Sequence, residues 1–497
     1  MHKPFYIVAA LSAISFSSFA QSDGNEVFIK QIGPNQATVE QGVDGALAKD
    51  NVAKILQQGE GNQSKITQGY NGTTSIENTA TLTQRGIGNQ SEILQGVYGM
   101  AEDNTATFIQ EGTANEGYIF QGYFGSSRNN TATLTQRGEV NMAIINQGEF
   151  KLAADNTATL TQQGDANLAS INQGTDQTGD SGDGDADGNA ATLIQRGDMN
   201  EAMIGQGVYG ASSYNTVTLS QVGNNNMATT NQGLYGEGSF NTATLAQAGN
   251  ENQVEMRQGV NGGIAMGNTA ALTQKGNSNE VFISQGDYSS IAEANVATLT
   301  QTGERNNVGI LQGGFNGRAE DNRATMTQQG RGNNGFTTQG TFGRAAMSMA
   351  TLTQQGDDNY GSIEQGSGST DDYNPENISL SDIATLSQRG VGNDGNIEQG
   401  RNGKSERNVA TLTQQGEGND ATIYQASDFI VVKAEDGSII SETLSDVQSF
   451  NSQAVVNQRG DDHYAVAIQA GTNDLIDIQQ HGSGSYAIVA QGASIPQ

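Results

Sequence analysis

An internal repeat constrains this chain more than any other feature of its sequence. The phrase NTATLTQRG begins at Asn78 and again at Asn130, and close variants recur along most of the chain. In fourteen copies the first glutamine of the phrase is Gln57, Gln84, Gln110, Gln136, Gln162, Gln195, Gln221, Gln247, Gln274, Gln301, Gln328, Gln354, Gln388 or Gln414. The steps are 26 or 27 residues, except for 33 before Gln195 and 34 before Gln388. A fixed period of this length predicts stacked structural repeats.

The spacing within each copy predicts two strands joined by a turn. In all fourteen copies a Gly follows the first Gln by two positions, an Asn by five and a second Gln by eleven. Alternate side chains of a strand share a face, so one face reads Asn, Ala, Leu, Gln and, after the turn, Asn, a small residue, Ile, Gln. Glycine between the strands suits a tight turn. Degenerate copies around Gln31, Gln458 and Gln480 raise the total to seventeen.

One Leu and one Ile per copy are too few for an independent core, so we expect the copies to stack. Stacking places Leu on Leu and Ile on Ile in two facing ranks. The expected core ranks include Leu82, Ile93, Leu134, Ile145, Leu160, Ile171, Leu352, Ile363, Leu412 and Ile423.

Inward amides would each cost about 1–3 kcal/mol without a hydrogen-bond partner. In-register stacking removes this cost, because each amide donates to its own copy in the next repeat. We therefore expect an assembly ladder that includes Gln84, Asn89, Gln95, Gln136, Asn141, Gln147, Gln162, Asn167, Gln173, Gln354, Asn359, Gln365, Gln414, Asn419 and Gln425.

These patterns predict an all-β fold: a β-solenoid of about 17 stacked strand-turn-strand repeats that forms two facing parallel sheets. The heavy use of Thr, Gly and Asn and the period of two argue against helices. Residues 35–374 contain no proline, which suits uninterrupted strand pairing. An antiparallel meander is the alternative, but it would not bring identical positions together.

The sequence predicts four segments. Residues 1–20 resemble a cleaved secretory signal, with Lys3, an apolar stretch and small residues before Gln21. This stretch is too short and too weakly flanked for a membrane anchor, so we expect a secreted, extracellular chain without membrane insertion. Residues 21–425 form the regular repeats, 426–457 an irregular insertion and 458–497 degenerate repeats. Within the insertion, FIVVKAEDGSII has two β-prone halves around Asp436-Gly437, which predicts a hairpin on the solenoid.

Charge and composition exclude several classes of protein. The net charge is −30, and loss of Lys3 with the signal would make it −31, because 22 basic residues then face 53 acidic ones. Such a chain would repel phosphates, so we expect no nucleic-acid partner. The chain has no Cys, and only His463 and His481 would remain after signal removal. No nucleophile and base stand at a meaningful spacing, so we expect no enzyme.

The repeat resembles the curlin repeat of curli-type bacterial amyloid fibres. That pattern, Q-x-G-x-x-N-x-A-x-x-x-Q, is complete from Gln162 to Gln173, and the resemblance extends over about residues 26–492. It implies a subunit that polymerises with itself on the surface of a Gram-negative cell into fibres for adhesion and biofilm matrix. It also implies a nucleator subunit and an outer-membrane secretion channel as partners. Three features depart from the family's pattern. Asn or, more rarely, another residue stands where the family has a Ser, six positions before the first Gln. The connecting loops are longer, and the repeats are more numerous.

One acidic loop is a weak calcium candidate. In TDQTGDSGDGDADGN the residues Asp183, Asp185 and Asp187 match the start of a calcium loop, but Ile194 stands where an EF-hand needs its bidentate Glu. An EF-hand is therefore excluded, and weak Ca²⁺ binding remains an alternative to a solvated acidic loop. We expect no other cofactor.

The outward threonines of the TLT segments suggest a different class of function. They occur in seven copies, as Thr81/Thr83, Thr133/Thr135, Thr159/Thr161, Thr298/Thr300, Thr325/Thr327, Thr351/Thr353 and Thr411/Thr413. A monomeric extracellular solenoid could bind ice or carbohydrate through such a face, although Ile109, Ile194 and Ala246 interrupt it. The simpler explanation is that Thr is a favourable residue on the wet face of a strand.

Overall fold

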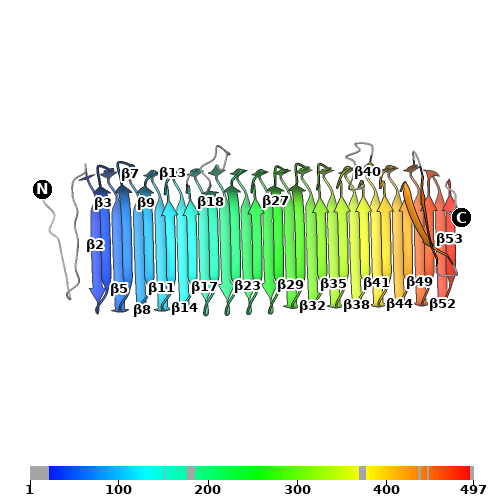
Figure 1. The fold of residues 1–497 in the computed structure, drawn as a ribbon, viewed down its shortest axis with the longest axis horizontal. Helices are drawn as coiled ribbons and strands as arrows, with labels where there is room; N and C mark the ends of the chain where they lie inside the picture. Colours follow the sequence, from blue (N-terminus) through cyan, green and yellow to red (C-terminus); the bar gives the residue numbers. More distant parts are fainter. Residues whose placement is uncertain are drawn as a thin grey trace. The chain divides into compact units, whose positions relative to one another are not determined.

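The chain is a parallel β-solenoid of about 17 turns (Figure 1). The structure is a computed structural model that describes residues 22–149, 151–175, 185–368, 377–434, 438–444 and 447–492. Across these ranges there is no helix, and hence none long and apolar enough to cross a membrane. The all-β solenoid is confirmed, and the antiparallel alternative is wrong because the stacked strands pair in parallel. The expected signal, residues 1–20, lies outside the described residues.

Each turn, here called a rung, contributes one strand to each of three parallel sheets. The first sheet holds the strands with the first Gln, the second sheet those with the second Gln, and a short sheet holds strands of two or three residues. By their internal contacts the residues divide into two units, Met1–Phe240 and Asn241–Gln497.

Among its described residues, the first unit has eight strands in each of its two main sheets. Its first sheet comprises β2 (Glu26–Ile32), β5 (Val52–Glu60), β8 (Thr79–Ile87), β11 (Thr105–Thr113), β14 (Thr131–Glu139), β17 (Thr157–Gln163), β20 (Ala190–Arg196) and β23 (Thr216–Val222). Its second sheet comprises β3 (Gln36–Val43), β6 (Gln63–Tyr70), β9 (Gln90–Val97), β12 (Glu116–Gln121), β15 (Met142–Gln147), β18 (Leu168–Thr175), β21 (Glu201–Val208) and β24 (Met227–Gln232). Its short sheet comprises β1 (Ser22–Asp23), β4 (Leu47–Lys49), β7 (Thr74–Ile76), β10 (Met100–Glu102), β13 (Ser126–Arg128), β16 (Leu152–Ala154), β19 (Ala186–Asp187), β22 (Ala211–Ser213) and β25 (Glu237–Ser239).

In the part of the second unit that the structure describes, each of the two main sheets has nine strands. Its first sheet comprises β26 (Thr242–Ala248), β29 (Thr269–Asn277), β32 (Val296–Glu304), β35 (Arg323–Arg331), β38 (Met349–Asp357), β41 (Ile383–Val391), β44 (Val409–Glu417), β49 (Gln453–Asp461) and β52 (Leu475–Ser483). Its second sheet comprises β27 (Gln253–Val260), β30 (Glu280–Asp287), β33 (Asn307–Gln312), β36 (Asn334–Gln339), β39 (Tyr360–Gln365), β42 (Asp394–Gln399), β45 (Asp420–Gln425), β50 (Tyr464–Gln469) and β53 (Tyr486–Gln491). Its short sheet comprises β28 (Ile264–Met266), β31 (Ile291–Glu293), β34 (Arg318–Glu320), β37 (Arg344–Ala346), β40 (Ile378–Leu380), β43 (Lys404–Glu406), β48 (Gln448–Phe450) and β51 (Gly471–Thr472).

The register places each residue beside its own copy in the next rung. Leu134 pairs with Leu160, for example, and Gln162 pairs with Gln195 across the 33-residue step. All ten expected core residues are buried, with at most 1% of their surface exposed. The Leu and Ile ranks therefore form the continuous apolar interior of each unit, which no single rung could build.

The short sheet was not predicted from the sequence. A small residue three positions before the corner Asn packs into it, as Ser75 does before Asn78 and Ala101 before Asn104, and both are buried. The residue directly before that Asn has a left-handed backbone, with φ of 55° at Glu77 and at Asp103. The connecting segments are thus a third side of the solenoid.

The glycine after the first Gln has another role than the one predicted. Gly86 lies inside β8, still paired with Gly112 of the next rung, and does not form the turn itself. A Cβ on Gly86, where φ is 119°, would lie 1.9 Å from the Gly112 carbonyl oxygen. Only glycine permits this close approach between rungs.

The inserted segment of the second unit forms an antiparallel hairpin, β46 (Phe429–Lys433) paired with β47 (Ile439–Thr443). The insertion ends earlier than the sequence-based boundary at 457, because β48 from Gln448 and β49 from Gln453 already pair with regular rungs. The boundary was placed too late because the marker glutamine, Gln458, stands near the middle of its strand.

Candidate functional site

Two rows of glutamine side chains run through the interior of each unit. In the first sheet, Gln84 Nε2 donates to Gln110 Oε1 at 2.8 Å, and Gln110 Nε2 donates to Gln136 Oε1 at 2.8 Å. In the second sheet, Gln95 Nε2 donates to Gln121 Oε1 at 2.8 Å. The second N–H is used as well, since Gln84 Nε2 also donates to the Asn89 carbonyl at 3.0 Å. The glutamines of the expected ladder are all fully buried and occupy these rows.

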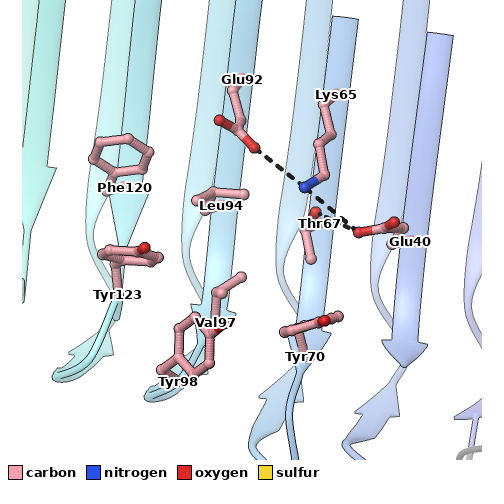
Figure 2. A pocket seen from close by; sticks show the side chains of 10 residues that line it. All are labelled: Glu40, Lys65, Thr67, Tyr70, Glu92, Leu94, Val97, Tyr98, Phe120 and Tyr123. Carbon is pink, nitrogen blue, oxygen red and sulfur yellow. Dashed lines mark hydrogen bonds and ion pairs between the residues drawn. The ribbon is translucent and has the colours of Figure 1, made fainter. Parts of the chain in front are cut away.

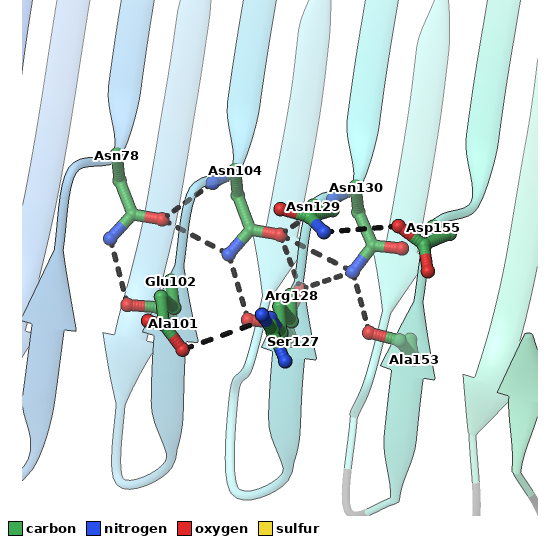
Figure 3. A network of polar contacts seen from close by, with 10 residues as sticks. All are labelled: Asn78, Ala101, Glu102, Asn104, Ser127, Arg128, Asn129, Asn130, Ala153 and Asp155. Carbon is green, nitrogen blue, oxygen red and sulfur yellow. Dashed lines mark hydrogen bonds and ion pairs between the residues drawn. The ribbon is translucent and has the colours of Figure 1, made fainter.

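Two rows of asparagines bind the backbone at the turns and at the corners, and Figure 3 shows part of the corner row. In the corner row, the backbone N and the Nδ2 of Asn104 both donate to Asn78 Oδ1 at 3.0 Å. Asn104 Nδ2 also donates to the Ser127 carbonyl of the next rung at 2.9 Å. The expected ladder asparagines lie in the turn row, where Asn89 Nδ2 donates to Asn62 Oδ1 at 2.9 Å. Each Asn thus fixes the backbone as well as the side chain of its neighbour.

The glutamine and asparagine rows point in opposite directions. The glutamines donate from Nε2 to the following rung, as Gln354 does to Gln388 at 2.8 Å. Most asparagines donate from Nδ2 to the Oδ1 of the preceding rung, as Asn359 does to Asn333 at 2.9 Å, whereas Asn156 reaches Asn130 Oδ1 through its backbone N alone. Two rows of each kind run side by side, and the sequence pattern gave no indication of their directions.

The second unit has a carboxylate in place of a corner asparagine at Asp382 and at Asp474. Asp382 is fully buried, its Oδ2 accepts from Ser379 Oγ at 2.6 Å, and its Oδ1 accepts from Asn408 N at 2.8 Å. Burial raises the pKa of the Asp382 carboxyl to about 6, although the hydrogen bonds from Ser379 and Asn408 act to lower it. The corner row therefore contains one group that titrates in the mildly acidic range.

The first rung of the first unit and the last rung of the second unit leave strand edges open. The strands β2 and β3 pair only with β5 and β6, and β52 and β53 pair only with β49 and β50, among the described residues. Side chains of the inward type are partly exposed at both edges: Val489 is 36% exposed, and Ile29 is half-buried although its neighbour Ile55 is fully buried. Such edges are templates for pairing with another strand.

The last link of one glutamine row is not made. Gln469 Nε2 donates to the Gln453 carbonyl at 2.8 Å, and within the described ranges Gln491 Oε1 has no hydrogen-bond partner. The final rung is therefore held less tightly than those behind it.

A shallow hollow of about 360 Å³ lies on the outer face of the second sheet, in the first rungs of the first unit (Figure 2). Lys65 Nζ lies there between two carboxylates, 3.3 Å from Glu92 and 3.6 Å from Glu40. Beside them Tyr98 stands edge-on to Tyr123, with ring centroids 6.0 Å apart. Aromatic faces beside carboxylates suit contact with the C–H faces and hydroxyl groups of a sugar.

Exposed and half-buried aromatic residues recur in the segments that join the second sheet to the short sheet. Tyr98 (φ 58°) stacks on Phe124 (φ 59°) with centroids 4.8 Å apart, and Tyr209 stacks on Tyr235 at 4.5 Å. In the second unit Phe315 stacks on Phe342 at 4.9 Å. Stacking of this kind contributes about 0.5–1.5 kcal/mol per pair, which is close to the cost of a left-handed backbone at a non-glycine residue.

The calcium candidates do not form a metal site in the part of the chain that is described. Asp183 lies outside the described residues. The Asp185 carbonyl accepts from Ser212 N at 2.9 Å, and the Asp187 carbonyl accepts from Tyr214 N at 2.8 Å, so the backbone of both residues takes part in the short sheet. Across the described ranges no three His, Cys, Asp or Glu side chains cluster closely enough to hold a metal ion.

The outward threonines form one regular rank in the first unit. Thr81, Thr107, Thr133, Thr159, Thr192 and Thr218 pair in succession. All three interruptions, Ile109, Ile194 and Ala246, fall in the other outward column. In the first unit the Thr face thus has one continuous column, from Thr81 to Thr218, beside a broken one; in the second unit Ala271 interrupts the first column as well.

No protein-family model matches this chain, and no curated protein matches it.

Proposed function

We propose that this chain is a secreted structural subunit that joins end to end with copies of itself into amyloid-like fibres. The observation that carries the proposal is the match between the two open edges, β52 with β53 and β2 with β3. A second copy placed at the C-terminal edge would continue the parallel register and keep apolar residues on apolar residues and Gln on Gln in the two main strands, whereas Asn25 and Asn35 would meet Asp474 and Ser485.

The match holds in both main sheets. In the first sheet, the inward pairs across the joint would be Ile476 with Val27, Ile478 with Ile29 and Gln480 with Gln31. In the second sheet they would be Ala487 with Ala37, Val489 with Val39 and Gln491 with Gln41. Apolar residues meet apolar residues, and each glutamine row meets a glutamine.

The energetics favour addition of a copy at the edge. Inward apolar side chains that are partly exposed at the edges would be buried, which contributes about 25 cal/mol per Å² of apolar surface. The glutamine rows would gain a link in which Gln480 and Gln491 donate forward, as Gln458 and Gln425 do in the rungs behind them. Each joint would thus repeat the apolar and glutamine contacts of an interior rung.

The curlin resemblance supports the remaining parts of the proposal. It implies fibres on the outside of a Gram-negative cell that serve adhesion and biofilm matrix, with export through an outer-membrane channel and growth from a nucleator. The features of this chain that agree with the resemblance are its repeats, its solenoid fold and its rows of buried amides.

Fibre growth by the purified chain that begins at Gln21 tests the proposal. We expect thioflavin-positive fibres that seed further growth and give a meridional reflection at about 4.7–4.8 Å. Joint replacement of Gln354 and Gln365 by Ala should weaken assembly, whereas replacement of the exposed Tyr98 should not. Equal fibre growth in both variants, or a chain that stays monomeric over days with seeds present, would contradict the proposal.

A second candidate function is the binding of ice or carbohydrate by a monomeric chain. The continuous column from Thr81 to Thr218 favours it. A Thr133→Lys variant should then lose ice-recrystallisation inhibition or binding to insoluble polysaccharide, while fibre growth stays unaffected.

A further inference from the structure

The hollow on the second sheet of the first unit has an ordered lining. Its floor is one outward column of four residues that pair in succession on β3, β6, β9 and β12: Glu40, Thr67, Leu94 and Phe120. Thr67 and Leu94, in the middle of this column, are buried, with 1% and 7% of their surface exposed. The floor is therefore largely apolar at its centre, with a carboxylate at one end and an aromatic ring at the other.

Two different walls flank this floor (Figure 2). On one side lie Lys65 and Glu92, which are neighbours in the adjacent outward column. On the other side lie Tyr70, the last residue of β6, and Tyr98, which directly follows β9. A ligand on the floor would therefore have charged groups along one edge and aromatic rings along the other.

The charged wall offers hydrogen-bond donors and acceptors side by side. The Lys65 ammonium lies between the carboxylates of Glu40 and Glu92, within 3.6 Å of both. A carboxylate has about four acceptor sites, and Thr67 Oγ1 uses one of them on Glu40 Oε2, at 3.2 Å. Both carboxylates can therefore accept further hydrogen bonds from a ligand.

The aromatic wall is held in place by contacts between its rings. Tyr98 stands edge-on to Tyr70, with centroids 5.9 Å apart, and edge-on to Tyr123 at 6.0 Å. Phe120, at the end of the floor, stacks against Tyr123 at 5.4 Å. The rings hold one another before a ligand arrives, which lowers the entropic cost of binding.

This lining is confined to the first rungs of the unit. In the floor column Phe120 is followed by Asn146 and Asn172, and Asn146 Nδ2 donates to Asn172 Oδ1 at 2.9 Å. The aromatic and apolar lining is therefore not a consequence of the repeat, which keeps the solenoid intact with asparagine at the same position.

We propose that this hollow binds a pyranose unit of a neutral polysaccharide. A sugar ring has an apolar C–H face, which suits Leu94 and the Tyr98 ring, and a rim of hydroxyl groups. Each hydroxyl both donates and accepts, so the rim can use the Glu92 carboxylate and the Lys65 ammonium together. The volume of about 360 Å³ lies within the range of small-molecule sites.

The same charges disfavour other ligands. An anion, including a sugar acid, would meet two carboxylates, Glu40 and Glu92, against one ammonium. A simple cation would meet the Lys65 ammonium and would leave the apolar floor without a contact. The site requires neither end-to-end assembly nor the Thr column, which lies on the first sheet; within the proposed fibre it would attach each subunit to polysaccharide of the surrounding matrix.

Saturation-transfer NMR on the purified chain tests the site. Irradiation of aromatic protons should transfer saturation to the C–H protons of a sugar that lies against the tyrosine rings. The neutral probes are cellotetraose, mannotetraose and galactotetraose, and the anionic probe is tetragalacturonate. We expect binding of at least one neutral probe, about 10-fold tighter than that of tetragalacturonate. No signal from any neutral probe at millimolar concentration, or tighter binding of the anionic probe, would overturn the proposal.

Two matched tyrosine variants locate the contact. Tyr98→Asn removes one ring of the hollow, and asparagine tolerates the left-handed backbone there, where φ is 58°. Tyr235→Asn is the control, on an exposed tyrosine with φ of 53° that stacks on Tyr209 outside the hollow. Tyr98→Asn should weaken binding of the neutral probe about 10-fold, and Tyr235→Asn should leave it unchanged. Equal effects of the two substitutions would overturn the assignment to the hollow.

Glu92→Gln tests the charged wall. It keeps the size of the side chain and removes the charge, so the preference for the neutral probe over tetragalacturonate should fall several-fold. Glu201→Gln, on an exposed outward residue of β21, should leave that preference unchanged. An unchanged preference in Glu92→Gln would overturn the role of this wall.

The Thr column and fibre growth are read separately. Loss of sugar binding in Thr133→Lys, together with parental binding in Tyr98→Asn, would place the sugar on the first sheet and overturn the proposal. Seeded fibre growth of Tyr98→Asn should equal that of the parent chain, so failure of the sugar site and failure of end-to-end assembly give different results.

Discussion

Asn104 donates two hydrogen bonds to one oxygen, Oδ1 of Asn78 in the preceding rung, each at 3.0 Å. One comes from its side chain and the other from its backbone, so the side-chain row also fixes the path of the chain at every corner. This coupling explains why the corner position keeps an amide in most rungs.

Asn104→Asp should therefore destabilise the first unit by about 3 kcal/mol, because it removes the Nδ2 donor and buries a charge without a cation beside it. Urea unfolding followed by circular dichroism measures the loss, and hydrogen exchange locates it. Asn71→Asp is the matched control, on an exposed left-handed residue, and should change stability by less than about 0.5 kcal/mol. Equal effects of the two substitutions would contradict the role of the row.

Gly86→Ala should be among the most destabilising single substitutions, at about 4 kcal/mol or more. Its new methyl group would lie 1.9 Å from the Gly112 carbonyl oxygen, and the backbone cannot move away without breaking the pairing. Gly88→Ala, two residues further on, meets nothing within 4 Å and should cost only about 1 kcal/mol from its left-handed backbone. The difference between their urea midpoints is the measurement, and similar midpoints would refute the steric argument.

Asp382→Asn should stabilise the second unit at neutral pH. The folded pKa of Asp382, about 6, lies above the value of about 3.9 in an unfolded chain, so folding favours the protonated form. Stability falls as pH rises through this window and stays low above it, by about 3 kcal/mol in the limit. Between pH 4 and 8, the unfolding midpoint of the variant should therefore depend less on pH than that of the parent chain.

The exposed Asp321→Asn serves as the control for this pH profile and should leave it unchanged. Some slope should remain in Asp382→Asn, because burial and the neighbouring Glu398 raise the pKa of Glu364 to about 7. A variant whose slope equals that of the parent chain would show that Asp382 is not the titrating group.

Val489→Asp should slow fibre growth at least 10-fold while leaving the stability of the single chain nearly unchanged. The side chain faces inward on the last rung but is still 36% exposed, so a charge there is solvated in the free chain and buried only in a joint. Seeded growth rates and urea midpoints separate the two effects. Val222→Asp, on an exposed residue facing outward in the first unit, should grow at the parental rate.

The sequence predicts the parts of the fold that depend on spacing alone. Gln84, Asn89 and Gln95 occupy the interior positions that strand parity assigns to them, because the pattern repeats often enough to fix the register. The short sheet escaped prediction because its only signal is a small residue such as Ala101, in segments of variable length. The direction of each amide row also escaped, since it depends on which oxygen the backbone N–H of the next rung reaches.

The opposed amide rows bear on how long such a stack can become. An α-helix aligns all its peptide dipoles and carries partial charges at its two ends. Here the carbonyl groups of the two glutamine rows point toward the preceding rung, and those of the two asparagine rows point toward the following one. Their dipoles largely cancel, so an added rung brings no growing field to the ends. The electrostatic cost of adding a rung should therefore be the same for a very long stack as for a short one.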